Sequence, residues 1–153
     1  MIACREKIIG MAVFFNKDEQ ARIVRAIEEA ELNTSGEIRV HVESKCKGDA
    51  VSRAIYVFNY LKMYETAQRN GVLVYVAHES KKLAIIGDVG INNKVPADFW
   101  NTIKDDMIAA FSRNCYVEGI CEAVKAAGIS LKEYFPYQQD DINEQPNEIS
   151  FGD

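Results

Sequence analysis

The chain has 153 residues, of which 48% are hydrophobic and 27% charged, and its formal net charge is −5. This length suits one domain with a sizeable core, and the composition is that of an ordinary globular protein. No hydrophobic run approaches the roughly 20 residues that span a bilayer. The first 11 residues, M-I-A-C-R-E-K-I-I-G-M, carry charges that argue against a signal peptide. We therefore expect a cytoplasmic location and no membrane insertion.

The negative charge gathers at the C-terminus, where five acidic residues follow position 139 without any Lys or Arg: Asp140, Asp141, Glu144, Glu148 and Asp153. Without these five, 18 acidic residues remain against 18 Lys and Arg, so the body of the chain is neutral. A surface that binds nucleic acid needs a basic excess, and we therefore expect no nucleic-acid partner. The four cysteines form no C-x-x-C pair, and we expect all of them to be free thiols: Cys4, Cys46, Cys115 and Cys121.

The N-terminal half predicts a helix, a strand and a second helix. Residues 17–32 have helical periodicity, and a break follows at 33–36. Residues 37–43 alternate strictly between polar and apolar side chains, which is typical of a strand with one polar face. A second helix is expected after Asp49 and as far as about Thr66, with an inner stripe of Val51, Ala54, Ile55, Phe58 and Leu61.

Two further strands and two helices are expected in the second half. Residues 72–77 read as a strand buried on both faces, and a five-residue connection leads to an antiparallel strand over 83–86. Helices follow over 95–114, with Pro96 in the first turn, and over 117–134. The fold class is therefore α/β, and the expected architecture is a three-layer α/β/α sandwich with a mixed β-sheet.

Three glycine-bearing turns are expected to meet at one edge of this sheet. A right-handed crossover places the starts of the first two strands together, and the antiparallel third strand ends at the same edge. That edge gathers Thr34–Glu37, Arg69–Gly71 and Gly87–Gly90. Oxygen atoms of Glu37, Asn70 and Asp88 are suitable ligands for Ca²⁺ or Mg²⁺. Asp88 and Arg69 are the candidate catalytic residues, with Arg69 holding a phosphate group.

The same residues also have a purely structural interpretation, in which glycine turns shape a hairpin edge and Arg69 simply pairs with Asp88. Other polar residues are weaker candidates: His41 packs beneath a helix or is exposed, and His78 lies in a solvated turn. Trp100 is either a core residue or a lid over the edge that contains Asp88. The chain has no P-loop, no C-x5-R loop, no D-x-D nucleophile motif and no G-x-S-x-G elbow, which argues against the familiar covalent phosphatase mechanisms.

Several blocks of the sequence resemble the TPM domain family: T-S-G-E-I-R-V-H-V-E at 34–43, R-N-G-V-L-V-Y-V-A at 69–77, A-I-I-G-D-V-G-I-N at 84–92, the F-W pair at 99–100, and N-E-Q-P-N-E-I-S-F-G at 143–152. The resemblance covers roughly residues 14–152 and is greatest to the short, soluble bacterial members. It implies an α/β/α sandwich, an acid phosphatase activity and divalent-cation binding. On this basis residues 1–13 are an N-terminal extension, 14–136 the TPM-like domain and 137–153 an acidic, loosely ordered tail, in which Ile149 and Phe151 are candidates for docking.

The chain departs from the family pattern at the candidate site. The commoner Asp-Asn-Gly before the second strand is Arg69-Asn70-Gly71 here. The commoner G-[YF]-G-[LV]-E after the third strand is Gly87–Asn92, G-D-V-G-I-N, so the acidic residue has moved.

Two functions follow as hypotheses. In the first, the protein is a cation-dependent phosphatase in which Glu37 and Asp88 bind the cation and Arg69 holds a phosphorylated substrate. In the second, it is a non-enzymatic domain that binds a protein partner and assists the assembly or repair of other proteins.

Overall fold

The computed structural model describes residues 15–137 and 144–152. Its strands are β1 (Glu37–Glu43), β2 (Gly71–Ala77), β3 (Lys82–Gly87) and β4 (Ser150–Phe151). Its helices are α1 (Lys17–Glu31), α2 (Ala50–Tyr60), α3 (Val89–Asn92), α4 (Asn101–Ser112) and α5 (Tyr116–Lys132).

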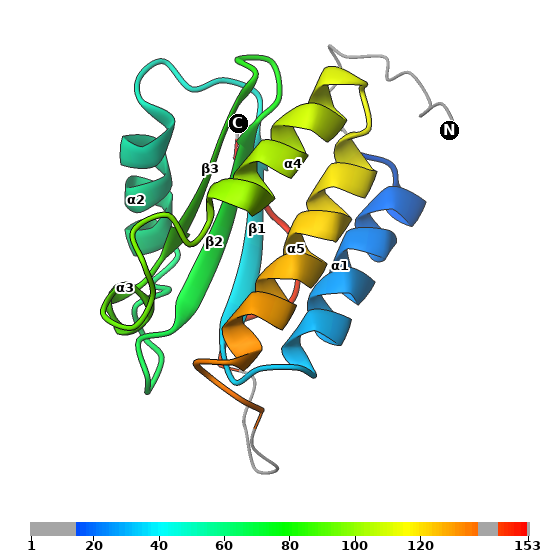
Figure 1. Ribbon diagram of the computed structural model, residues 1–153. Coiled ribbons are helices and arrows are strands. Elements are labelled where there is room, and N and C mark those ends of the chain that lie inside the picture. Colours follow the sequence, from blue (N-terminus) through cyan, green and yellow to red (C-terminus); the bar gives the residue numbers. More distant parts are fainter. Residues whose placement is uncertain (1–14, 138–143, 153) are drawn as a thin grey trace.

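The described elements form three layers, with α2 on one face of the sheet and α1, α4 and α5 on the other (Figure 1). The strand order is β3-β2-β1-β4, in which β1 runs parallel to β2 and β4, and β2 runs antiparallel to β3. The predicted α/β/α sandwich with a mixed sheet is therefore confirmed.

Each face of the sheet has its own apolar core because successive side chains of a strand point to opposite faces. Ile38, Val40 and Val42 of β1 pack with α1, α4 and α5, whereas Leu73, Tyr75 and Ala77 of β2 pack with α2. Complete burial of one such large side chain contributes about 1.5–3 kcal/mol. The alternation that predicted β1 is thus the pattern that assigns its apolar side chains to the three-helix layer.

Helix α2 differs most from the expectation. It ends at Tyr60 rather than near Thr66, because Lys62 adopts the left-handed conformation (φ 55°) and the Met63 N–H donates to Phe58 O at 3.1 Å. Its buried face contains Val57 in place of Val51 and Ile55, which are 43% and 49% exposed.

The segment between β3 and α4 also differs from the expectation. A short helix, α3, begins directly after Asp88, where only a turn was expected. Helix α4 begins at Asn101 instead of residue 95, since the Phe99 N–H donates to Pro96 O at 3.1 Å and closes a separate turn. Both differences bring Asp88 and Trp100 close to the same surface, as described below.

The C-terminal segment 144–152 lies along β1. Ser150 is the register partner of His41, and the Gly152 N–H donates to Val42 O at 2.9 Å. Both residues expected to dock do so, since Ile149 packs against the core and Phe151 is the register partner of Val42, whereas Asp140, Asp141 and Asp153 lie outside the described range.

The cysteines also differ from the expectation. Cys46 and Cys121 are free thiols, but Cys115 is disulfide-bonded, so the prediction of four free thiols is wrong. Within the described residues, none of the helices has the length and hydropathy needed to cross a membrane.

Candidate functional site

The ends of β1, β2 and β3 share one edge of the sheet, which we call the Asp88 rim. Glu37 is the register partner of Gly71, and the Asp88 N–H donates to Gly71 O at 2.9 Å. Glu37 and Asp88 therefore lie on either side of Gly71, about 10 Å apart in backbone position across two strand spacings. The topology predicted from the sequence places these turns together.

Asp88 forms a two-point ion pair with Arg69. The Arg69 Nε donates to Asp88 Oδ2 at 2.7 Å, and its Nη2 donates to Oδ1 at 3.0 Å. Oδ1 also accepts the Val89 N–H at 2.8 Å, which caps α3. The Asp88 side chain is 5% exposed and the Arg69 side chain 47% exposed. Because solvent reaches the guanidinium, screening by water weakens the contribution of this pair to stability.

Gly90 holds the Arg69 loop against α3. Its N–H donates to Arg69 O at 2.9 Å, and a Cβ at this position would lie 2.1 Å from Gln68 O and 2.5 Å from Arg69 O. Only a glycine permits this approach of two backbone segments. The glycine therefore fixes the distance between the turn that carries Arg69 and the helix that Asp88 caps.

The side chain of Asn70 is buried at this rim. Only 1% of the residue is exposed, and neither the amide oxygen nor the amide nitrogen has a hydrogen-bond partner among the described residues. Its main chain is fully used, since its N–H donates to Thr66 Oγ1 at 3.2 Å and its carbonyl accepts the Glu37 N–H at 3.3 Å. Leaving a buried polar group unpaired costs about 1–3 kcal/mol, which makes the Asn70 amide a candidate ligand group at this rim.

Glu37 has different partners from those expected of a cation ligand. Its carboxylate accepts the backbone N–H groups of Glu144 and, at 3.1 Å, of Gln145. Burial raises the pKa of Glu37, and burial together with the neighbouring Glu37 raises the pKa of Glu31 to about 8. The two carboxyl groups therefore share a proton near neutral pH. No hydrogen bond within the described part of the chain joins Glu37 to Asp88 or Arg69.

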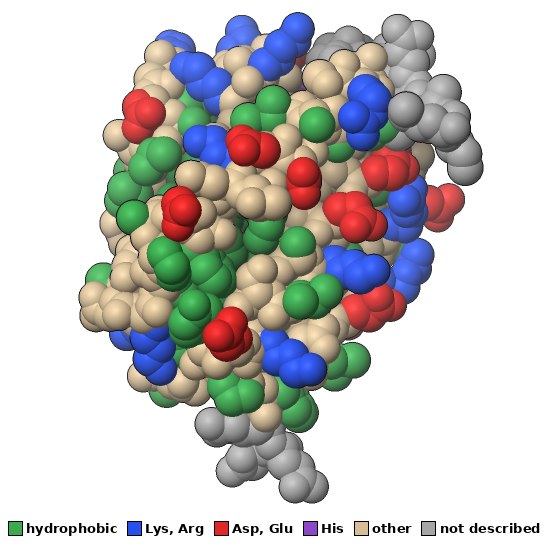
Figure 2. All heavy atoms as spheres, in the orientation of Figure 1, with side chains coloured by type: hydrophobic (Ala, Val, Ile, Leu, Met, Phe, Trp, Pro, Cys, Tyr) green, Lys and Arg blue, Asp and Glu red, His purple; other side chains and the backbone are tan. Residues whose placement is uncertain are grey.

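A cavity of about 430 Å³ lies beside the Arg69–Asp88 pair. Figure 2 shows hydrophobic side chains gathered in a hollow between α2 and the start of α4. The apolar lining comes from α2, β3, the first residue of α3 and the turn before α4: Val51, Ile55, Phe58, Ile85, Ile86, Val89 and Trp100. Trp100 packs edge-to-face on Phe99 with ring centroids 4.6 Å apart, and its indole N–H has no partner among the described residues. Trp100 thus packs against the core, which was one of the two expectations for it, and it also lines this cavity.

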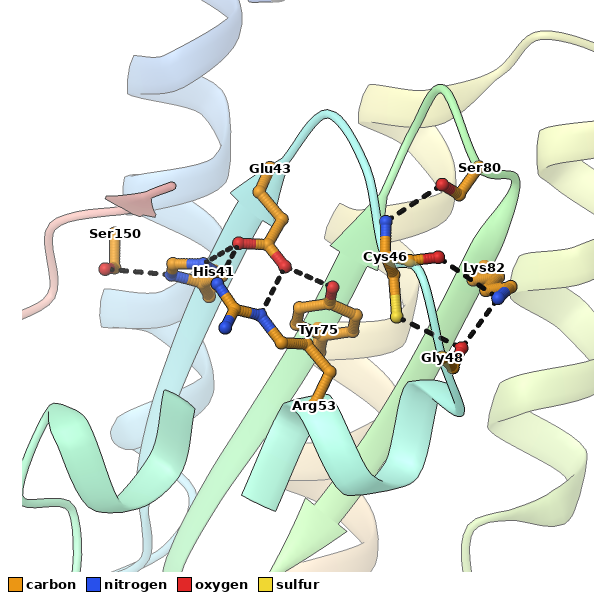
Figure 3. Close-up of polar contacts among 9 residues, drawn as sticks. All are labelled: His41, Glu43, Cys46, Gly48, Arg53, Tyr75, Ser80, Lys82 and Ser150. Atoms are coloured by element: carbon orange, nitrogen blue, oxygen red, sulfur yellow. Dashed lines mark hydrogen bonds and ion pairs between the residues drawn. The ribbon is translucent and has the colours of Figure 1, made fainter. Parts of the chain in front are cut away.

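A second polar cluster, the Glu43 cluster (His41, Glu43, Arg53, Tyr75 and Ser150), lies toward the other end of β1 (Figure 3). Arg53 donates to both Glu43 oxygens at 2.8 and 2.9 Å, and the Tyr75 hydroxyl donates to Glu43 Oε2. The His41 ring lies between Glu43, 3.3 Å from Nε2, and Ser150, 3.0 Å from Nδ1. Burial lowers the pKa of His41.

The charge on Glu43 is strongly favoured by its partners. Burial alone would raise its pKa, but the hydrogen bonds from Arg53, Tyr75 and His41 outweigh that effect and lower the pKa to about 2. The polar face of β1 was the sequence feature that marked this cluster. For His41 it indicated only packing beneath a helix or exposure to solvent. His41 is buried, with 6% exposed, and the C-terminal segment pairs with it, a contact that no local pattern predicted.

His78 was expected in a solvated turn, but it is buried at the end of β2. Its N–H donates to Glu43 O at 3.0 Å, and burial lowers its pKa. The solvated-turn interpretation of His78 is therefore wrong.

Comparison with known proteins shows the family and the fold of this chain. A family model for the TPM domain matches residues 8–129. The chain belongs to the TPM domain family. It is similar to the BA42 protein of the psychrophilic bacterium Bizionia argentinensis, solved by NMR, with 45% identity and a TM-score of 0.88, covering 94% of this chain and 99% of BA42.

A more distant structure shows the fold alone. The N-terminal domain of the cg2496 protein from Corynebacterium glutamicum has 11% identity and a TM-score of 0.60, covering 91% of this chain and 80% of that domain. No curated protein matches the sequence.

Proposed function

We propose that this TPM domain binds a divalent cation, Ca²⁺ or Mg²⁺, at the Asp88 rim and hydrolyses a phosphate monoester there. The observation that carries the proposal is the Arg69–Asp88 pair, which lies on the wall of the cavity of about 430 Å³. The planar guanidinium of Arg69 is suited to a phosphate group, and the carboxylate of Asp88 is suited to a hard cation. The two groups lie side by side, and each neutralises the charge of the other while no ligand is bound.

The chemistry of the rim suits a hard cation. Asp88 offers carboxylate oxygens, and the buried Asn70 amide oxygen has no partner among the described residues. Among the described residues no three His, Cys, Asp or Glu side chains cluster as metal ligands, so amide and carbonyl oxygens are needed beside Asp88. Glu37 is the weakest of the proposed ligands, since its carboxylate already accepts two N–H groups and shares a proton with Glu31.

The residues of the rim have separate roles in this proposal. Asp88, with Asn70 and Glu37, holds the cation, which when bound supplies positive charge that offsets the charge developing on the phosphoryl group. Arg69, released from Asp88, binds two phosphate oxygens through its planar guanidinium. The apolar walls contributed by Ile55 and Trp100 hold the organic part of the substrate and exclude water.

A phosphatase assay with p-nitrophenyl phosphate tests the proposal directly. We expect turnover that requires added Ca²⁺, Mg²⁺ or Mn²⁺, disappears with chelator and falls at least about a hundredfold in Asp88→Ala. Asp98→Ala is the matched control, because Asp98 is exposed in the turn before α4 and lines neither the cavity nor the rim. Equal rates in the parent protein and Asp88→Ala would rule out this function for the rim.

An interaction domain is the second candidate, and the exposed face of α2 favours it. The exposed fraction is 38–74% for four residues of α2 and for Tyr64 in the turn after it; the four are Val51, Ile55, Tyr56 and Tyr60. Tyr56 and Tyr60 stack with centroids 6.4 Å apart, and Arg53 lies over the Tyr56 ring. Exposed aromatic rows are typical of surfaces that bind protein partners.

A capture experiment separates this candidate from the phosphatase. If the face binds a protein partner, Tyr60→Ser lowers the amount of partner recovered by cross-linking, whereas Asp88→Ala does not. Recovery that is unaffected by Tyr60→Ser would exclude this face. The cytoplasmic location expected from the sequence stays a prediction under either function.

A further inference from the structure

A second cavity lies at the opposite end of the sheet from the Asp88 rim. It has a volume of about 620 Å³ and is bounded by the β2–β3 hairpin and by α4. This volume is within the range of about 300–1,000 Å³ that small-molecule sites have. None of the residues that form the Asp88 rim lines it, so it is independent of the proposed phosphatase site.

The wall that α4 contributes is amphipathic. Lys104, Ile108 and Phe111 all line the cavity, and their spacing of four and three residues places them on one side of the helix. Ile108 is 49% exposed, although it is a large aliphatic side chain. Val76 and Leu83 continue the apolar wall on the strands. The cavity therefore has an apolar wall that is partly exposed to solvent.

The charge on the lining is positive. Lys81, Lys82 and Lys104 line the cavity, and the described lining contains no Asp or Glu. None of these lysines forms a salt bridge within the described part of the chain. Figure 2 shows Lys and Arg side chains gathered at the end of the molecule where the β2–β3 hairpin lies. The charge of the lining thus favours an anion.

Lys82 is held in place without being neutralised. Its Nζ donates to Gly48 O at 2.6 Å and to Cys46 O at 3.1 Å (Figure 3). An ammonium group has three N–H donors, so one remains for a ligand. Asp49 is an opposing charge that does not line the cavity: hydrogen bonds from the Ser52 N–H at 2.9 Å and the Ser52 hydroxyl at 3.0 Å lower its pKa, and the charges of Lys82 and Lys104 lower it further.

We propose that this cavity binds a small amphipathic carboxylate, with an apolar body against Ile108 and Phe111 and an anionic head at Lys82 and Lys104. A medium-chain fatty acid has this chemistry. Lysine ammonium groups act as point charges and need no fixed fork geometry, which suits a single carboxylate head. The apolar body contributes through burial of the exposed part of Ile108.

Amide NMR shifts of the full-length ¹⁵N-labelled protein, titrated with octanoate, test the proposal. We expect saturable shifts confined to the cavity, including the amides of Lys82, Leu83 and Ile108. Octanamide, which has the same tail but no charge, should bind about tenfold more weakly, and acetate, which lacks the tail, should cause no saturable shift. The same octanoate shifts are expected in Asp88→Ala, which keeps this test separate from that of the phosphatase.

Matched variants locate the head and the body of the ligand. Lys104→Gln should weaken octanoate binding about fivefold, while Lys125→Gln on the exposed side of α5 leaves it unchanged. Ile108→Asn should weaken binding, whereas Ile129→Asn, at a position that is 57% exposed on α5, should not. Shifts spread over the whole molecule, equal affinity for octanamide, or equal effects of the Lys104 and Lys125 changes would each overturn the proposal.

Discussion

Two arginine–carboxylate pairs lie near opposite ends of the sheet, and they have almost the same geometry. Arg53 contacts Glu43 at 2.8 and 2.9 Å, and Arg69 contacts Asp88 at 2.7 and 3.0 Å. In both pairs the carboxylate is buried and the arginine is roughly half-exposed. Distances alone do not separate a structural pair from a functional one.

The surroundings of the two carboxylates do differ. Glu43 also accepts from Tyr75 and contacts His41, and Gly152 covers it so closely that a Cβ there would lie 2.4 Å from Oε1. Among the described residues the Asp88 carboxylate is paired with Arg69 and the Val89 N–H, and it lines a cavity. Asn70, which follows Arg69 in the chain, has no partner for its side-chain amide among those residues. The Glu43 cluster is saturated with partners, whereas the Asp88 rim has room for a ligand.

The largest effect is expected from breaking the saturated pair. Glu43→Gln removes the charge that Arg53, Tyr75 and His41 surround, and breaking a buried pair costs about 3 kcal/mol or more. Urea unfolding should show this loss, together with weaker protection of the Ser150 and Gly152 amides. A loss no greater than that in Asp88→Asn would contradict the distinction between the two pairs.

A smaller loss is expected from disturbing the backbone of the Asp88 rim. In Gly90→Ala the new methyl group must displace the carbonyl groups of Gln68 and Arg69, at a cost of about 1–3 kcal/mol. Gly48→Ala is the control, because a Cβ there meets no atom within 4 Å. Thermal unfolding should show a lower Tm only for Gly90→Ala, and equal behaviour of both variants would mean that the contact is not tight.

The shared proton at Glu31 and Glu37 predicts a pH dependence. The pKa of Glu31 is about 8 in the folded protein and ordinarily 4.5, so between these values the folded state holds a proton that the unfolded state releases. The free energy of unfolding should therefore fall as pH rises through this window, by about 1 kcal/mol or more. Glu31→Gln should remove this decrease, and the exposed control Glu29→Gln should retain it. A decrease that persists in Glu31→Gln would show that another group causes it.

The smallest change in stability is expected at Arg69. Because its guanidinium is 47% exposed, Arg69→Gln should leave the Tm nearly unchanged. The same variant removes the cation that competes for Asp88, so Ca²⁺ should bind more tightly to it than to the parent protein, as isothermal calorimetry can measure. Weaker Ca²⁺ binding in Arg69→Gln would mean that Arg69 does not compete for the site.

Local patterns were sufficient for most of the fold but not for contacts between distant segments. The alternation of residues 37–43 predicted β1, and chain direction placed Arg69 and Asp88 at one edge. No local pattern indicated that Gly152 would cover Glu43 or that Glu144 and Gln145 would bind Glu37, because those contacts join residues about 107 positions apart. The inner face of α2 was misassigned because Val51, Ile55 and Val57 are equally apolar, and only packing decides among them.

A Ca²⁺ titration followed by amide NMR shifts tests most directly whether the Asp88 rim, and not the Glu43 cluster, accepts a cation. We predict localised, saturable shifts at Gly36, Asn70 and Asp88, with no change at His41, Glu43 or Ser150. Unchanged spectra at millimolar Ca²⁺, or shifts that are largest in the Glu43 cluster, would contradict this account.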